Sequence, residues 1–297
     1  MSLLSQFPFI HSDESWLGGL SRAMMHHLSP AATEPFLDLI SRHPHAIKTL
    51  FHVLQIPLIL IFGYHPFSLR LLSLIAGFAG ACAFYRLLRL RFSSDTALWG
   101  SVFLLFDIQF IYASHFARQE IFLFSLLILA LYLFSRGEQR HERRCFRLSA
   151  FAVGISIGFH PNSFLISLPV GAFHLVRLAA ARRRVEFRKR LRDLLEYVAV
   201  LAACAALFVI LSLAMDPQFF SHYASTGRDL GVAVPLYIKY FRFPDFYLKL
   251  FHGISGTYFT PDIRLQFFLF AAAAVLSLPA ALVRRRHVQL IVSTLSG

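Results

Sequence analysis

Three short polar clusters in this chain carry side chains that can do chemistry. The first is His11-Ser12-Asp13-Glu14, in which two neighbouring carboxylates could accept a proton. The second is Arg118-Gln119-Glu120, which combines a cation for an anionic ligand with a further carboxylate. The third is His160-Pro161-Asn162, where a histidine and a proline interrupt apolar sequence. Together they favour an active site over a scaffold if the fold brings them to one side of the molecule.

The composition predicts a membrane protein. Apolar residues make up 57% of the 297 residues and charged residues 15%, whereas soluble domains have about 45–50% and about 25%. The mean hydropathy of +0.59 agrees, and a soluble core could not easily hide 33 Phe side chains. The net charge of +13 does not indicate nucleic acid binding, because the basic residues lie in short runs between apolar segments.

Eight apolar segments are candidates for membrane helices. A helix needs about 20 residues to cross a bilayer, with about 17 as the lower limit. The segments that meet or approach this length are 67–85, 97–114, 197–215 and 265–283. The shorter segments are 49–64, 119–135, 148–159 and 163–176.

Basic residues orient these segments in the membrane. Four patches, within 86–91, 136–147, 177–192 and 284–286, hold 19 of the 29 basic residues. Short loops rich in Lys and Arg stay cytoplasmic, so an even number of crossings must separate successive patches. This predicts an all-α, polytopic integral membrane protein with about seven crossings. All three polar clusters then lie on the non-cytoplasmic side.

The same scheme divides the chain into four parts. Residues 1–48 form an outer loop, in which Trp16, Leu17, Leu20, Met24 and Leu28 recur at helical spacing and predict an interfacial helix over 13–28. Segment 49–64 contains Pro57 and is expected to be re-entrant or interfacial. The remaining parts are a transmembrane module over 49–215, an outer loop over 216–263, and a helix with the start of another over 264–297. We expect a chain truncated at both ends, because no crossing precedes the outer N-terminus.

Five motifs follow one another along the first half of the chain. They are the pair Asp13-Glu14, Arg22-Ala23-Met24, Arg42-His43-Pro44-His45, Gly63 to Leu71 (with Phe67 and Arg70), and Ala117-Arg118-Gln119-Glu120. Their order and spacing resemble the GT-C membrane glycosyltransferases, particularly the protein O-mannosyltransferase and aminoarabinose-transferase branch (glycosyltransferase family 39-like). The resemblance covers residues 11 to about 180. The chain lacks the family's second proline after Pro44.

The resemblance implies a GT-C-type helix bundle that moves a sugar from a polyprenyl-phosphate-linked donor to a hydroxyl of a protein, lipid or glycan. It places the family's catalytic acid at Asp13, which would act as general base with Glu14 as its partner. The departing lipid phosphate needs cations, from Arg or Lys or from a divalent metal, and the sequence does not decide whether a metal is used. The residues expected to bind donor phosphate or acceptor are Arg22, His43, Arg118, Glu120, His160, Asn162 and Arg228.

Each candidate residue also has a structural alternative. Asp13 and Glu14 could be carboxylates that favour the positive end of a helix dipole. Arg118 and Glu120 could be an exposed ion pair of little energetic value, and His160 could be packed and hydrogen-bonded. Asp107, inside a membrane segment, is either functional or paired with Arg70 from a neighbouring helix.

Three functions for the whole protein remain open at this level. The first is a glycosyltransferase, with its active site on the outer face of a bacterial plasma membrane. The second is a non-enzymatic carrier or flippase of lipid-linked sugars, and the third is an inactive fragment. A transporter needs polar residues in both membrane halves, so clusters on a single face favour the enzyme. The expected partners are the lipid-linked donor, membrane lipid and an acceptor that the sequence does not identify, with no nucleic acid.

Overall fold

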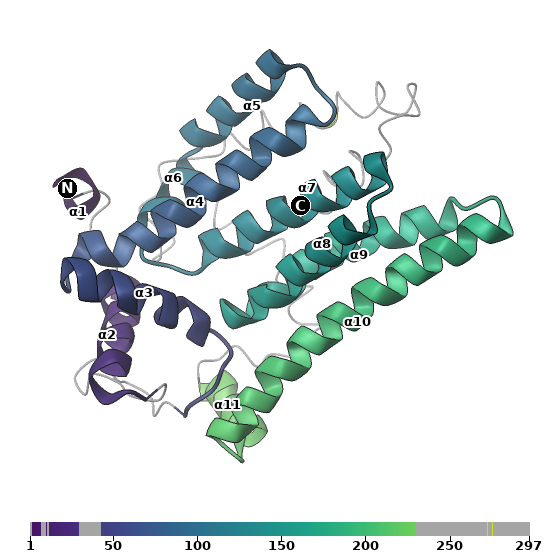
Figure 1. Cartoon of the computed structure of the whole chain (residues 1–297). Helices are drawn as coiled ribbons and strands as arrows, with labels where there is room; N and C mark the ends of the chain where they lie inside the picture. Colours follow the sequence, from purple (N-terminus) through teal and green to yellow (C-terminus); the bar gives the residue numbers. More distant parts are fainter. Residues whose placement is uncertain are drawn as a thin grey trace. The chain divides into compact units, whose positions relative to one another are not determined.

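The computed structural model of the protein describes residues 2–6, 10, 12–29, 43–229, 272 and 275. Every regular element among them is an α-helix or a 3-10 helix, which confirms the all-α prediction (Figure 1). The chain divides into two compact units, Met1–Phe219 and Phe220–Gly297. The predicted helix over 265–283 and most of the loop over 216–263 lie outside the described residues. The second unit is therefore described mainly by α11 (Phe219–Asp229).

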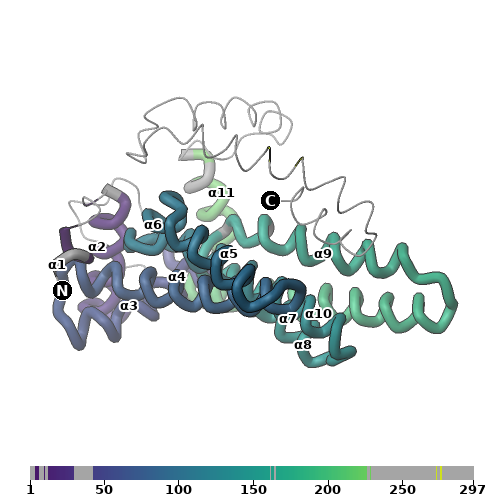
Figure 2. The backbone as a smooth tube through the Cα atoms, turned by 90° about the horizontal axis from the view of Figure 1, so that it is seen from above, coloured from purple at the N-terminus to yellow at the C-terminus, as the bar shows by residue number. Residues whose placement is uncertain are grey.

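The first unit is built around four helices that pack in sequence order. These are α4 (Pro66–Arg89), α7 (Glu120–Arg140), α8 (Arg143–Ile155) and α10 (Arg184–Met215), side by side in Figure 1. Helices α5 (Ser94–Phe106) and α6 (Ile108–His115) pack against α4, and α9 (Phe164–Ala179) packs against α10 (Figure 2). The remaining elements are α1 (Ser2–Gln6), α2 (Ser12–His27), α3 (Thr49–Phe62), η1 (Ser156–Gly158) and η2 (Pro161–Ser163).

Small residues allow the central helices to approach closely. A Cβ atom added at Gly80 in α4 would collide with the side chain of Ser125 in α7. The Ser125 hydroxyl donates a hydrogen bond of 2.7 Å to the carbonyl of Ala76. Gly154 in α8 faces α10 in the same way, where an added Cβ would lie 2.6 Å from Cys204 Sγ. Contacts of this kind are typical of helices that associate within a bilayer.

Three described helices, α4, α7 and α10, are long and apolar enough to cross a membrane. Helices α5 and α6 would supply a fourth crossing if together they form one broken span. Large apolar side chains such as Phe78, Phe103 and Ile210 are exposed on these helices. Such exposure would be costly in water and is expected against lipid. The protein is an integral, multi-pass membrane protein.

The predicted single helix over 97–114 is wrong, because the chain breaks at Asp107. Helices α5 and α6 meet there at 66°. Oδ1 of Asp107 accepts a hydrogen bond of 2.8 Å from the backbone N–H of Phe110, so the side chain caps the new helix. The suggested pairing of Asp107 with Arg70 is not formed, because the Arg70 guanidinium is bound by Glu14 and by the carbonyl of Leu4.

The predicted helix over 13–28 is present as α2, but its apolar face is used differently from our expectation. Leu17, Leu20 and Met24 are buried, and α2 packs mainly against α3. Trp16 and Leu28 remain exposed. Most of this apolar face therefore packs against α3 within the protein. Because this packing already removes the face from water, it is not available to insert into the outer leaflet.

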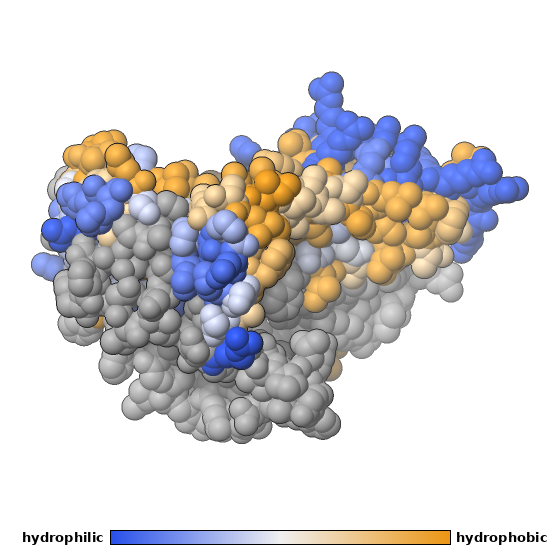
Figure 3. All heavy atoms as spheres, turned by 90° about the horizontal axis from the view of Figure 1, so that it is seen from below, coloured by the Kyte–Doolittle hydropathy of each residue, from blue (hydrophilic) through white to orange (hydrophobic). Residues whose placement is uncertain are grey.

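The two ends of the central helices differ in charge. The turns from α4 to α5, α7 to α8 and α9 to α10 lie toward the same side in Figure 1, and they carry the first three basic patches. Hydrophilic side chains gather at that side in Figure 3, beside a hydrophobic surface. Arg118 and Glu120 lie at the opposite end of α7, about 30 Å from its basic end. The basic turns and the Arg118–Glu120 pair thus lie at opposite ends of the bundle.

Candidate active site

Glu14 forms a buried ion pair that anchors the start of α2. The Nε and Nη2 atoms of Arg70 donate to the two Glu14 oxygens at 2.9 and 2.8 Å. Arg70 is 1% exposed, and its Nη1 donates to the Leu4 carbonyl at 3.0 Å. Glu14 Oε1 also accepts from the backbone N–H of Ala117 at 2.7 Å. One carboxylate thus connects α2 with α4 and with the turn before α7, and it has little freedom to accept a proton from a substrate.

Asp13 has a different environment, although it precedes Glu14 directly. Successive residues of a helix point about 100° apart. The Asp13 side chain is 41% exposed and lies 3.3 Å from Nη1 of Arg118. The Asp13 carboxylate is therefore partly exposed to solvent and lies beside a cation.

Arg118 lies between two carboxylates. Its Nη2 donates to Glu120 Oε1 at 2.6 Å, and its Nη1 lies beside Asp13. The Arg118 side chain is 17% exposed. Its backbone carbonyl accepts a hydrogen bond of 3.1 Å from Ser73 Oγ, which fixes the turn against α4. The carboxylate oxygens of Asp13 and Glu120 are ligands of the kind that a divalent ion uses. In this structure, the Arg118 guanidinium occupies the space between the two carboxylates.

His160 lies at the break between α8 and α9, close to this cluster. Phe159 stacks on Phe122, in the first turn of α7, with ring centroids 4.4 Å apart. Burial, more than any charge, lowers the pKa of His160 to about 4, and the field of Glu120 opposes this shift. His160 is therefore neutral at pH 7. Its Nδ1 accepts from the backbone N–H of Asn162 at 3.0 Å, which leaves the ring proton on Nε2.

Lys48 is a member of this site that the sequence analysis does not single out. The charges of Lys48 and Arg118 both act to lower the pKa of His160, so Lys48 belongs to the electrostatic environment of that ring. Its backbone has φ = 71°, in the left-handed region, immediately before α3. A non-glycine residue held in this conformation is strained, and strain of this kind is common at functional sites. In the sequence, the only sign of a role for Lys48 is that this cation directly precedes an apolar segment on the predicted outer side.

The structure brings together Asp13, Arg118, Glu120 and His160. Glu14 is buried beside them and fixes the turn before Arg118. Asn162 joins them through its bond to His160, and its side chain is exposed. These contacts do not involve the other three predicted residues. Arg22 is exposed on α2 and stacks over the Tyr64 ring at 5.0 Å, His43 is half-buried before α3, and Arg228 is exposed on α11 in the second unit.

Comparison with known proteins agrees with this fold. The family model of dolichyl-phosphate-mannose-protein mannosyltransferases matches residues 49–212. Two crystal structures of ArnT from Cupriavidus metallidurans, in the apo state and bound to undecaprenyl phosphate, are similar at TM-scores of 0.56 and 0.57. Both are 18% identical to this chain and cover 69% and 70% of it, but only 38% of ArnT is covered. No curated protein sequence matches significantly.

These matches confirm the GT-C resemblance that the motif order predicts. The ArnT structures support the fold, and the family model supports the membership, because it covers more than half of the 297 residues. The chain belongs to the dolichyl-phosphate-mannose-protein mannosyltransferase family.

Proposed function

We propose that the protein transfers a sugar from a polyprenyl-phosphate-linked donor to an acceptor hydroxyl, on the non-cytoplasmic face of a bacterial plasma membrane. The observation that carries this proposal is the half-exposed Asp13 carboxylate, held 3.3 Å from the Arg118 guanidinium at one end of a membrane-embedded bundle. The cluster pairs a base with a cation, as transfer from a lipid phosphate requires. The matched family is named for a lipid-phosphate sugar, and ArnT has been crystallised with undecaprenyl phosphate.

The proposed step needs one proton acceptor and one cation. The acceptor oxygen attacks the anomeric carbon of the sugar, and its proton passes to the carboxylate of Asp13. The bond between the anomeric carbon and the phosphate oxygen breaks, and its electron pair leaves with the polyprenyl phosphate. Arg118 would stabilise the charge that develops on this phosphate. Because the pKa of His160 is lowered to about 4, its neutral ring can donate a hydrogen bond but adds no charge.

Glu120 and Glu14 position the Arg118 guanidinium. Glu120 holds Arg118 when no phosphate is present, through the 2.6 Å contact with Nη2. Glu14 binds the backbone N–H of Ala117, the residue before Arg118, and so fixes the turn that carries the guanidinium. Neither residue needs to exchange a proton.

The test is donor consumption by the purified full chain in lipid nanodiscs. Polyprenyl-phosphate mannose is the first donor, and an extract of periplasmic glycans, lipids and proteins supplies acceptors. We expect acceptor-dependent release of polyprenyl phosphate, with loss of release in the Asp13→Asn variant. Transbilayer movement of intact donor in proteoliposomes, with no release across a panel of polyprenyl-phosphate sugars, would instead identify a carrier.

A further inference from the structure

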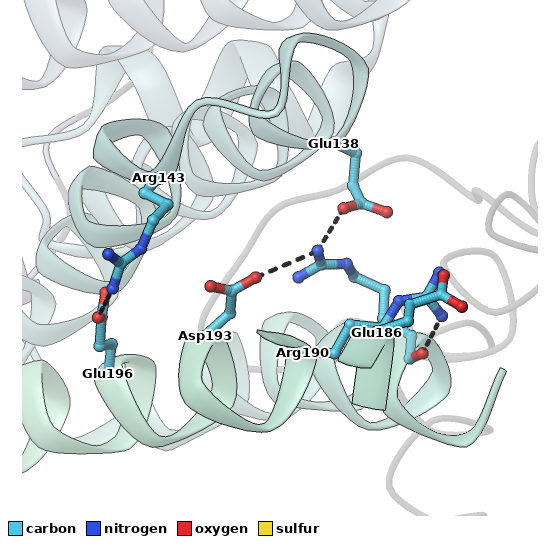
Figure 4. Close-up of polar contacts among 7 residues, drawn as sticks. Glu138, Arg143, Glu186, Arg190, Asp193 and Glu196 are labelled. Atoms are coloured by element: carbon cyan, nitrogen blue, oxygen red, sulfur yellow. Dashed lines mark hydrogen bonds and ion pairs between the residues drawn. The ribbon is translucent and has the colours of Figure 1, made fainter. Parts of the chain in front are cut away.

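The first turns of α10 carry an unusual concentration of positive charge. Residues 182–196 contain seven basic and three acidic residues. The three acids are Glu186, Asp193 and Glu196, and each is bound by an arginine within the bundle. Figure 4 shows one such pair for each of the three acids, together with the contact of Glu138 with Arg177, the arginine that binds Asp193. The negative charges of these three acids are therefore balanced by arginines of the same helix bundle.

The other cations of this region face away from the bundle. Six of them are exposed, namely Arg182, Arg183, Arg184, Arg188, Lys189 and Arg192. Among these, Arg184, Arg188 and Arg192 recur every four residues and lie within about 80° of one another around the helix axis. We name these three residues the basic stripe. Asp193 and Tyr197 lie on the opposite face, where Asp193 binds Arg177 and the Tyr197 hydroxyl donates to the Ser167 carbonyl at 2.8 Å, both on α9.

The basic stripe continues directly into a lipid-facing surface. Leu195 lies on the same face of α10 and is 59% exposed, and Val198 follows with 51% exposure. With 32 residues, α10 is about 48 Å long, whereas a hydrocarbon core is about 30 Å thick. The apolar stretch over 197–215 is long enough for that core, so the basic stripe begins at headgroup depth with Arg192, about 8 Å beyond the stretch, and runs outward to Arg184, about 20 Å beyond it. Figures 1 and 2 both show the corner between α9 and α10 extending beyond the neighbouring turn from α7 to α8.

We propose that the basic stripe binds the phosphate headgroups of anionic phospholipids, in the leaflet opposite the Asp13–Arg118 cluster. Arginine suits this ligand because its planar fork pairs with two phosphate oxygens. A soluble polyanion would gain nothing from the apolar surface that follows on the same face. This binding depends on the membrane position of α10 and not on the proposed transfer reaction.

The experiment compares lipid adducts of the full chain by native mass spectrometry from detergent. The probes are phosphatidylglycerol, zwitterionic phosphatidylcholine and inorganic phosphate. The test variant combines Arg184→Gln, Arg188→Gln and Arg192→Gln, and glutamine keeps helix propensity close to that of arginine. A matched control removes three other charges at the same end of the bundle, with Arg86→Gln, Arg140→Gln and Arg144→Gln. A third variant replaces the stripe by lysines.

We expect the parent protein to retain phosphatidylglycerol over phosphatidylcholine and over inorganic phosphate. The glutamine stripe variant should bind phosphatidylglycerol about 10- to 100-fold more weakly, since each cation near an anionic surface contributes attraction. The control should lose only a small part of this affinity, and the lysine variant should keep most of it. Equal losses in the stripe variant and the control would overturn the proposal, as would retention of phosphatidylcholine or inorganic phosphate as tight as that of phosphatidylglycerol. Unchanged melting in phosphatidylcholine shows that each variant is folded.

Discussion

Asp13 and Glu14 show at the scale of single residues how position decides the role of a carboxylate. Glu14 is buried and binds a guanidinium and a backbone N–H, so its lone pairs are committed to the fold. Asp13 is 41% exposed and lies 3.3 Å from the Arg118 guanidinium. A general base needs an open lone pair within reach of a ligand. The exposure of Asp13 therefore suits the proposed role of general base better than the burial of Glu14 does.

Arg118 should bind the phosphate of the donor through its planar fork. Arg118→Lys replaces the fork by a point charge, and Arg118→Ala removes the cation altogether. We expect undecaprenyl phosphate to bind more weakly to both, by about 10- to 100-fold in the alanine variant, because a hydrogen bond to a charged group contributes about 1.5–3 kcal/mol. Microscale thermophoresis in detergent measures this affinity.

The matched control for Arg118 is Arg86→Lys, an exposed arginine at the basic end of α4. It should bind undecaprenyl phosphate as well as the parent protein. If both Arg118 variants also bind normally, Arg118 only anchors the turn. The phosphate site would then have to be sought in the loop over 216–263, beginning with Arg228.

His160 should make the protein less stable in weak acid. In the unfolded chain it takes up a proton near its ordinary pKa of 6.5, whereas in the fold its pKa is about 4. Between these values the unfolded state binds more protons, so stability falls as the pH drops from about 6.5 toward about 4. His160→Gln cannot titrate, and its melting temperature in detergent should fall less over this range.

The control for the pH series is His27→Gln, because His27 is exposed at the end of α2. Other groups also titrate in this window, so the informative quantity is the difference in slope between each variant and the parent. A slope for His160→Gln equal to that of the parent would mean that His160 does not resist protonation in the fold.

At the scale of elements, α2 depends on the pair between Glu14 and Arg70. Glu14→Gln leaves a guanidinium that is 1% exposed without its counter-charge. Breaking a buried ion pair from one side costs about 3–5 kcal/mol. We therefore expect a clearly lower melting temperature for Glu14→Gln, whereas Asp13→Asn on the same helix should melt close to the parent.

The double variant Glu14→Leu with Arg70→Met separates the charge from the packing. Replacing both members of a buried pair by apolar residues often costs little, so this variant should melt above Glu14→Gln. If Glu14→Gln melts like the parent, the buried contact does not hold α2 in place.

The sequence predicts most helices of the described region because their apolar runs are long and continuous. Segment 67–85 corresponds to α4, which extends at both ends through the cap at His65 and the terminal Arg89. Segment 197–215 corresponds to only part of α10, because its first turns are charged and hydropathy does not mark them. The break at Asp107 cannot be predicted from hydropathy, because a single capping side chain barely changes the mean hydropathy of the segment that contains it.

The polar cluster was predictable only in outline. Charge counting assigned Asp13, Arg118 and His160 to one face, but it carries no information on which side chains touch. The pairing of Glu14 with Arg70 joins residues 56 positions apart, and either residue has other plausible partners in sequence. Lys48 lacks any motif, and only the effect of its charge on the pKa of His160 connects it with the cluster. Pairings of this kind depend on how the helices pack, which no local pattern encodes.

At the scale of the whole molecule, the basic turns and the polar cluster should lie on opposite sides of the membrane. The three cysteines, Cys82, Cys145 and Cys204, are free and can be replaced to give a background for single-cysteine labelling. We expect a membrane-impermeant maleimide to label Asp13→Cys in intact cells. Arg184→Cys should react only after permeabilisation.

The two positions serve as controls for each other, because both are accessible to solvent in the fold. Labelling of position 184 in intact cells, with position 13 protected, would reverse the orientation. The site would then face the cytoplasm, and the proposed acceptors would have to be cytoplasmic molecules.

The most direct test of the proposed function is the Asp13→Asn variant, assayed for donor binding and for transfer in the same preparation. Asparagine keeps the shape of the side chain but cannot take the proton of an attacking hydroxyl. We predict that release of polyprenyl phosphate falls by about 10²–10⁴-fold while the affinity for undecaprenyl phosphate changes little. Transfer by Asp13→Asn at the rate of the parent protein would contradict the assignment and leave Asp13 as a residue that only orients Arg118.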